Sequence, residues 1–198
     1  MNSIKNFPRF YKFPIDTWRE SFNYIYFKKD KIYFTDGTVL FCLSRDRFFP
    51  DEGNPLPEEF LIHAKNSYPL SLKMVKYYEI KDGLIVPLRS YYPFSTLHPA
   101  GAVNIFRKKD MEYPDVEKFI KKIQRKKYTE SKENKVCFSS NVIKSISTVF
   151  PDKQIKFFID GEKKPVWFIE AESGDFGLIM PYVNHIDCIL PEDIRFDK

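Results

Sequence analysis

Glycine and cysteine are scarce in this sequence, and each shortage excludes a class of protein. Only 7 glycines occur in 198 residues, which disfavours folds built on glycine-rich phosphate loops. The three cysteines, Cys42, Cys137 and Cys188, share no CxxC spacing. A disulfide framework or a zinc site is therefore not expected, and this cysteine usage fits a reducing cytoplasm.

Membrane-spanning and metal-binding patterns are also missing. No apolar run approaches the length of a membrane span, and the N-terminus has no signal-peptide core. The three histidines, His63, His98 and His185, lie far apart and form no metal-ligand motif. We therefore expect a cytoplasmic protein that contacts no membrane and holds no metal or cofactor.

Catalytic signatures are absent as well. The sequence has no nucleophile elbow, Walker A loop or dinucleotide fingerprint. Asp160, Glu170 and Asp175 are candidates for paired catalytic carboxylates, but the two aspartates neighbour turn glycines, where aspartate is common for backbone reasons. We predict that the protein is not an enzyme, with a nuclease using Asp160 and Asp175 as the enzymatic alternative.

Aromatic residues, in contrast, make up 17% of the chain, and such residues favour half-buried strands. The pattern predicts strand–helix–strands units repeated three times, with an extended start over residues 9–15. Helices are expected over residues 17–28, 57–66 and 141–149. The expected strands cover residues 31–44 with a turn at Asp36-Gly37, 74–80, 84–88, 103–107, 154–159, 165–170 and 176–180. Their short connections require antiparallel pairing, so the expected fold class is α+β with large antiparallel sheets.

Residues 116–127 form the most strongly patterned segment. Val116, Phe119, Ile120 and Ile123 fall on one helical face. The opposite face carries five cations: Lys118, Lys121, Lys122, Arg125 and Lys126. Two interpretations stay open. The cations contact the phosphates of double-stranded DNA without sequence specificity, or they are the solvated face of an ordinary amphipathic helix.

Three stretches of the sequence together resemble one family. Residues 138–183 read FSSNVIKSISTVFPDKQIKFFIDGEKKPVWFIEAESGDFGLIMPYV, a helix followed by three strands that end in Met-Pro. Residues 35–40 read TDGTVL and residues 113–116 read YPDV. Taken in chain order, 35–40, 113–116 and 138–183, they resemble the bacterial sliding clamp, the β subunit of the replicative DNA polymerase.

The resemblance implies a function and a site. Sliding clamps are homo-oligomeric rings that encircle DNA and act as processivity factors. They dock DNA polymerase and other replication proteins through short linear motifs. The implied peptide-binding residues here are Thr35, Gly37, Thr38, Val39, Leu40, Pro114, Lys118, Phe119, Leu178, Ile179 and Met180. The implied DNA-binding residues are the five cations of the basic helix.

The sequence also departs from the family. Thr38 and Val39 stand where the family has His-Arg, and the chain continues beyond Met-Pro. It is too short for three clamp domains. We predict a two-unit domain over residues 1–115, resembling the middle clamp domain. A shortened domain over residues 116–198 would follow, with an extension over 184–198. The protein is then either a reduced clamp, of phage or mobile-element type, or a clamp-like adaptor or decoy that binds replication peptides or a host clamp without forming a ring.

Overall fold

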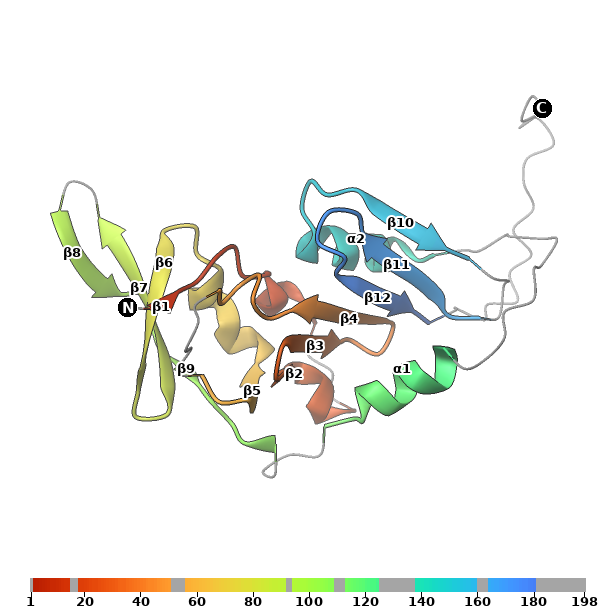
Figure 1. Cartoon of the computed structure of the whole chain (residues 1–198), viewed down its shortest axis with the longest axis horizontal. Coiled ribbons are helices and arrows are strands. Elements are labelled where there is room, and N and C mark those ends of the chain that lie inside the picture. Colours follow the sequence, from red (N-terminus) through yellow and green to blue (C-terminus); the bar gives the residue numbers. More distant parts are fainter. Residues whose placement is uncertain are drawn as a thin grey trace.

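The structure is a computed structural model that describes residues 2–14, 18–50, 56–91, 94–108, 113–124, 138–159 and 164–180. Two antiparallel sheets dominate it. One has seven strands in the order β10-β11-β12-β4-β3-β2-β5, and the other has the order β1-β6-β7-β8 with β9 beside β7. Figure 1 shows the smaller sheet at one end of the molecule and α2 with β10–β12 towards the other. The predicted mixture of helices with antiparallel sheets is confirmed.

The large sheet combines strands from both halves of the chain. Its members are β2 (Tyr24–Lys28), β3 (Lys31–Thr35), β4 (Val39–Ser44), β5 (Glu59–His63), β10 (Ile155–Phe158), β11 (Val166–Glu170) and β12 (Phe176–Ile179). The predicted hairpin at Asp36-Gly37 joins β3 to β4. Gly37 has φ +87°, and Asp36 Oδ1 accepts hydrogen bonds from the N–H groups of Thr38 and Val39, both at 2.9 Å. A left-handed glycine and an Asx turn therefore close this hairpin.

Two predicted helices are wrong. Residues 20–23 form only a short 3-10 helix, η2 (Glu20–Asn23), and the chain then enters β2. Four consecutive residues of β2, from Tyr24 to Phe27, are buried. Such a run is typical of a strand that is covered on both faces. The aromatic residues of this segment also have helical spacing, which is why a helix was predicted. Residues 57–66 likewise form β5 and the start of a 3-10 helix, η3 (Ala64–Ser71). Residues 9–15, predicted to be extended, also contain a 3-10 helix, η1 (Phe10–Lys12).

The C-terminal half follows the prediction closely. The helices α1 (Val116–Gln124) and α2 (Ser140–Val149) form where apolar spacing predicted them. Ser139 caps α2, since its hydroxyl accepts from the N–H of Val142 at 3.4 Å. Strands β10, β11 and β12 then pair in sequence as an antiparallel meander. Local signals were sufficient here because the segment is built from neighbours in the chain.

The smaller sheet consists of β1 (Asn2–Ser3), β6 (Val75–Lys81), β7 (Leu84–Tyr91), β8 (Phe94–Pro99) and β9 (Val103–Asn104). The tight turn between β6 and β7 places Asp82 and Gly83 at φ 51° and 75°. This is the aspartate-glycine signal of a two-residue hairpin. The predicted pair of strands around residues 81–83 is therefore confirmed.

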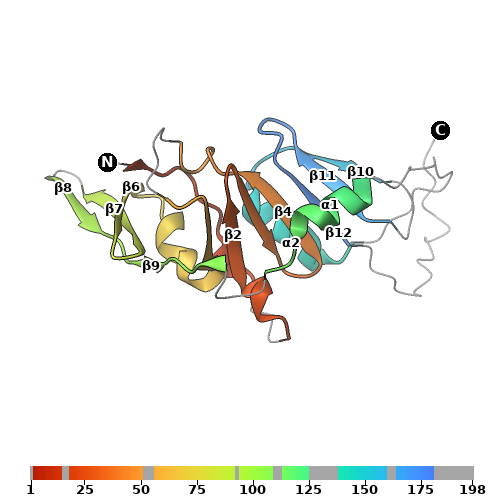
Figure 2. The same ribbon diagram turned by 60° about the horizontal axis from the view of Figure 1, so that its bottom comes forward.

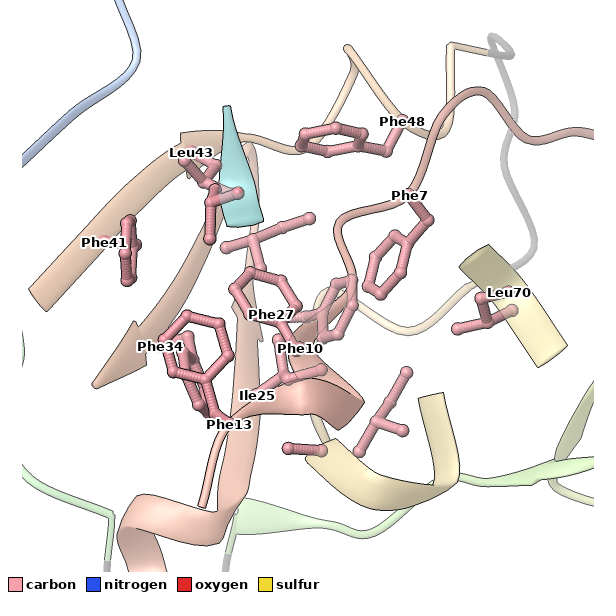
Figure 3. Packing of buried hydrophobic residues seen from close by; sticks show 14 of the residues in the cluster. Phe7, Phe10, Phe13, Ile25, Phe27, Phe34, Phe41, Leu43, Phe48 and Leu70 are labelled. Carbon is pink, nitrogen blue, oxygen red and sulfur yellow. The ribbon is translucent and has the colours of Figure 1, made fainter. Parts of the chain in front are cut away.

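The large sheet separates two hydrophobic clusters. On one face, Phe7, Phe10 and Phe13 of the N-terminal segment face the sheet's Phe27, Phe34 and Phe41, as Figure 3 shows. The rings of Phe10 and Phe34 lie 4.7 Å apart between centroids. The apolar side of α2 joins this cluster through Val142, Ile146 and Val149. The second cluster lies on the other face and contains α1.

The helix α1 covers the second face of the sheet. Its Val116, Ile120 and Ile123 pack in one cluster with Leu40 of β4 and Leu178 of β12. In Figure 2, α1 lies in front of β4 and β12. The molecule is thus layered in this region, with α1 on one side of the sheet and α2 with the N-terminal segment on the other.

The predicted division at residues 115–116 does not coincide with a break in the sheet. Strand β12 pairs with β4 along four residues, from Phe176 opposite Cys42 to Ile179 opposite Val39. The two parts of the chain therefore share one hydrogen-bonded sheet. None of the helices in the described ranges is long and apolar enough to cross a membrane.

Candidate functional site

Two of the three clamp-like stretches become neighbouring strands. Leu178 lies opposite Leu40, and Ile179 lies opposite Val39. The pairing continues past the strand end, where the N–H of Met180 donates to the carbonyl of Thr38 at 2.9 Å. Gly177 permits this approach, because a Cβ there would collide with the Phe168 ring and the Leu40 carbonyl. The fold thus brings residues 35–40 and 178–180 together.

The third stretch lies across the same face. Tyr113 is buried, and its hydroxyl donates to the carbonyl of Tyr33 at 3.5 Å. Asp115 Oδ1 accepts from the N–H of Lys118 at 3.0 Å, which stabilises the first turn of α1. Because Val116 packs in the cluster of Leu40 and Leu178, all three stretches meet on the α1 side of the large sheet.

Polar contacts fasten α1 to the sheet. Lys28 Nζ lies 2.8 Å from Glu117 Oε2, and the Tyr33 hydroxyl donates to Glu117 Oε1 at 3.3 Å. The hydrogen bond from Lys28 lowers the pKa of the Glu117 carboxyl and raises that of Lys28. Nearby, burial and a hydrogen bond to Glu59 raise the pKa of Tyr26. Sequence analysis missed this network, because nothing local links residues so far apart in the chain.

Strand alternation divides the implied peptide-binding residues between two faces. Leu40 and Leu178 belong to the cluster under α1, whereas Val39 and Ile179 belong to the opposite cluster of phenylalanines. Successive residues of a strand point to opposite sides of its sheet. Thr35 lies opposite Leu40 in the β3–β4 ladder and so shares its face. Val39 and Ile179 therefore cannot line the same surface as the others.

The implied peptide-binding residues on the α1 side of the sheet also differ in their exposure to solvent. Leu178 is fully buried and Leu40 nearly so. Met180 is 40% exposed and Phe119 is 38% exposed, so both are accessible to a partner. The accessible members of the predicted set, which we call the β4–β12 rim, are Gly37, Thr38, Pro114, Lys118, Phe119 and Met180.

The basic face of α1 is also accessible. Lys118, Lys121 and Lys122 are exposed, while Val116, Ile120 and Ile123 are buried. The predicted amphipathic arrangement is confirmed over these residues, although Phe119 is partly exposed. Arg125 and Lys126, the other two predicted DNA contacts, lie outside the described residues.

The candidate catalytic carboxylates have structural partners. Glu170 and Asp175 are buried at the turn between β11 and β12. Asp175 Oδ1 accepts from the N–H of Ser44 at 2.7 Å, and Arg47 pairs with the other oxygen. The Glu170 carboxylate accepts the N–H groups of Glu172 and Ser173 at 3.0 and 2.9 Å. These bonds brace the turn against β4. Asp160 lies outside the described residues.

Two further observations limit the chemistry of the described residues. No cluster of three or more His, Cys, Asp or Glu side chains within them could hold a metal ion. Cys42 is a buried free cysteine, and burial raises the pKa of its thiol to about 12, so it stays protonated and unreactive. Cys137 and Cys188 lie outside the described ranges.

Comparisons with protein-family models, curated proteins and solved structures find no match. Only the three motif stretches and their positions in the fold point to a clamp-like function.

Proposed function

We propose that this protein is a non-enzymatic, clamp-like adaptor that binds a short apolar segment of replication proteins at the β4–β12 rim. One observation carries the proposal. Three stretches that are separate in the sequence meet on one face of the sheet, where Met180 is hydrogen-bonded to Thr38 and α1 packs on Leu40 and Leu178.

The chemistry of the rim suits a peptide. Met180 is a flexible side chain that adapts to different apolar partners, and Phe119 adds an exposed aromatic ring. Lys118 stands beside Phe119 on α1 and favours a segment with an acidic residue next to its apolar anchor. Since α1 already covers Leu40 and Leu178, the segment would lie on the exposed rim and leave the helix in place.

A binding assay tests the rim directly. A fluorescently labelled clamp-binding peptide is titrated with the protein, and its polarisation is measured. Met180→Lys should remove binding, because it places a charge where the apolar anchor sits. Met74→Lys is the matched control, since Met74 is 49% exposed beside the smaller sheet, away from the rim. Equal peptide affinity in Met180→Lys and the wild type would refute the adaptor.

A ring that encircles DNA is the second candidate, and the end strand β10 favours it. Among the described strands it is an end member of the seven-stranded sheet, and Phe157 and Phe158 on it are 39% and 51% exposed. An unpaired apolar edge can pair with another chain. A homo-oligomeric ring of this kind could direct the cations of α1 towards double-stranded DNA.

Two measurements separate the ring from the adaptor. Light scattering gives the mass of the assembled species, and retention on closed circular DNA is compared with retention on linear DNA. Only a closed ring is trapped on a circle while sliding off a linear end. A monomer that binds the peptide and shows no difference between the two DNA forms is an adaptor.

A further inference from the structure

A cleft of about 530 Å³ lies on the side of the large sheet opposite α1. Four segments form it: the N-terminal segment with Arg9 and Lys12, the loop after β4 with Arg47 and Phe48, the connection into β6 with Lys73, and the end of α2 with the residues that follow it. Two of its walls are Phe7 and Val149, which belong to the phenylalanine cluster on that face. The cleft is therefore separate from the β4–β12 rim.

The cleft is strongly basic. Five cationic side chains line it, against a single carboxylate, Asp152. Arg47 pairs with Asp175, and Lys153 pairs with Glu172, so these two cations are neutralised. Arg9, Lys12 and Lys73 make no ion pair with any carboxylate of the described residues.

Arg9, Lys12 and Lys73 are exposed, and together they place three cations with no carboxylate partner among the described residues along one concave surface. Like charges repel one another, and low-dielectric walls strengthen the field inside a cleft. An anion that enters the cleft would relieve the repulsion, and charge-assisted hydrogen bonds from lysine and arginine would hold it.

The other lining groups narrow the chemistry of the ligand. Phe7 and Phe48 are each only 3% exposed, so neither offers a ring face on which a base could stack. The hydroxyls of Ser147 and Thr148 donate to the carbonyl of Lys144 within α2. Recognition therefore depends on the cations, and a multiply charged anion is the ligand they favour.

We propose that this cleft binds a small compound with several phosphate groups, held by Arg9, Lys12 and Lys73. The volume falls in the range of small-molecule sites, roughly 300–1,000 Å³, and accommodates a ligand of nucleotide size. The site is independent of peptide binding at the rim, because the two lie on opposite faces of the sheet.

Isothermal titration calorimetry at low ionic strength, with inorganic tripolyphosphate as the probe, tests the site. The wild type should bind, and the affinity should fall as salt is added. Arg9→Gln combined with Lys73→Gln should weaken binding by at least about tenfold, since two of the three free cations are lost. Lys76→Gln is the control, because Lys76 is an exposed cation on β6 that does not line the cleft.

Additional variants and a second ligand complete the experiment. Lys12→Gln alone should also weaken binding, which provides a second variant if the double variant fails to fold. Peptide binding at the rim should be unchanged in all of these variants, so failure of one proposal is distinct from failure of the other. Absence of tripolyphosphate binding, or equal affinity in the double variant and the wild type, overturns the proposal. A single-stranded oligonucleotide that binds where tripolyphosphate does not would also overturn it, in favour of a nucleic-acid backbone.

Discussion

The backbone N–H of Met180 donates to the carbonyl of Thr38 at 2.9 Å. This bond extends the β12–β4 ladder one step beyond the pair of Ile179 and Val39. It joins the last described residue of the chain to the turn that follows β3. The position of the exposed Met180 side chain therefore depends on how closely β12 docks against β4.

Gly177 controls that docking, and Gly177→Ala should strongly destabilise the fold. The added Cβ would meet the Phe168 ring and the backbone carbonyl of Leu40, and neither can withdraw from a packed sheet. We expect a loss of about 3 kcal/mol or more in the free energy of unfolding, measured by urea denaturation.

Gly174→Ala serves as the control for this substitution. Gly174 has φ +72°, but an added Cβ would meet nothing within 4 Å. Only backbone strain remains, which costs about 1 kcal/mol. Equal losses in the two variants would show that close packing at Gly177 does not hold β12 in place.

The ion pair between Lys28 and Glu117 should contribute modestly to the anchoring of α1. The two side chains are 31% and 39% exposed, so solvent screens their attraction. A double-mutant cycle with Lys28→Met and Glu117→Gln should give a coupling energy of about 0.5–1 kcal/mol that shrinks at high salt. The more exposed pair of Lys31 and Asp30, at 3.8 Å, should couple more weakly. A coupling that salt leaves unchanged would contradict the screened pair.

Acid should destabilise the protein through Glu170. Burial alone would raise the pKa of this carboxyl, but hydrogen bonds from Ser173 and Glu172, with the charge of Arg47, bring it below the ordinary value of 4.5. A lowered pKa in the folded state stabilises the fold above pH 4.5, and this contribution is lost as the pH falls through the folded value. Below pH 4.5 the melting temperature of Glu170→Gln should fall less steeply with pH than that of the wild type. At neutral pH the variant should already have the lower melting temperature. If the melting temperatures of the variant and the wild type fall in parallel with pH, Glu170 is not responsible for the acid sensitivity.

His63 should produce a separate pH effect nearer neutrality. Burial lowers its pKa from 6.5, and its ring packs edge-on against Tyr24 at 5.0 Å between centroids. The neutral form is favoured in the folded state, so stability is complete above pH 6.5 and declines as the pH falls below it. His63→Gln should lose this decline while keeping the steeper one due to Glu170. Melting temperatures measured across the two windows separate the residues.

The cations of α1 should determine any affinity for double-stranded DNA. Replacing Lys118, Lys121 and Lys122 with glutamine removes three potential phosphate contacts. The slope of log affinity against log salt should then fall by about 3 if all three contact phosphate. A matched variant with Lys76, Lys81 and Lys144 replaced keeps the net charge equal and should retain the slope. If both triple variants change the slope alike, the effect is one of net charge and α1 is not the contact surface.

The prediction from sequence succeeded where structure is local. The Asp36-Gly37 turn, the cap of α2 and the apolar stripe of α1 depend on residues within a few positions of one another. Helices were predicted over residues 17–28 and 57–66 because apolar residues in both segments have helical spacing. There β2 and β5 pair with each other, with Phe27 stacked on Phe60 at 4.3 Å. That pairing is a long-range contact, and it outweighed the local helical preference.

For the candidate site as well, local features were predictable from the sequence and long-range features were not. From the sequence alone, short connections and residue spacing predicted the antiparallel class and the basic face of α1, and three stretches resembled segments of sliding clamps. The folded structure was needed to show that these stretches meet at the β4–β12 rim, and that Val39 and Ile179 face away from it. It alone placed Arg9, Lys12 and Lys73 in one cleft. Strand register and the packing of distant segments set these relationships. Neither can be predicted from residues that are neighbours in the chain, because both depend on long-range contacts.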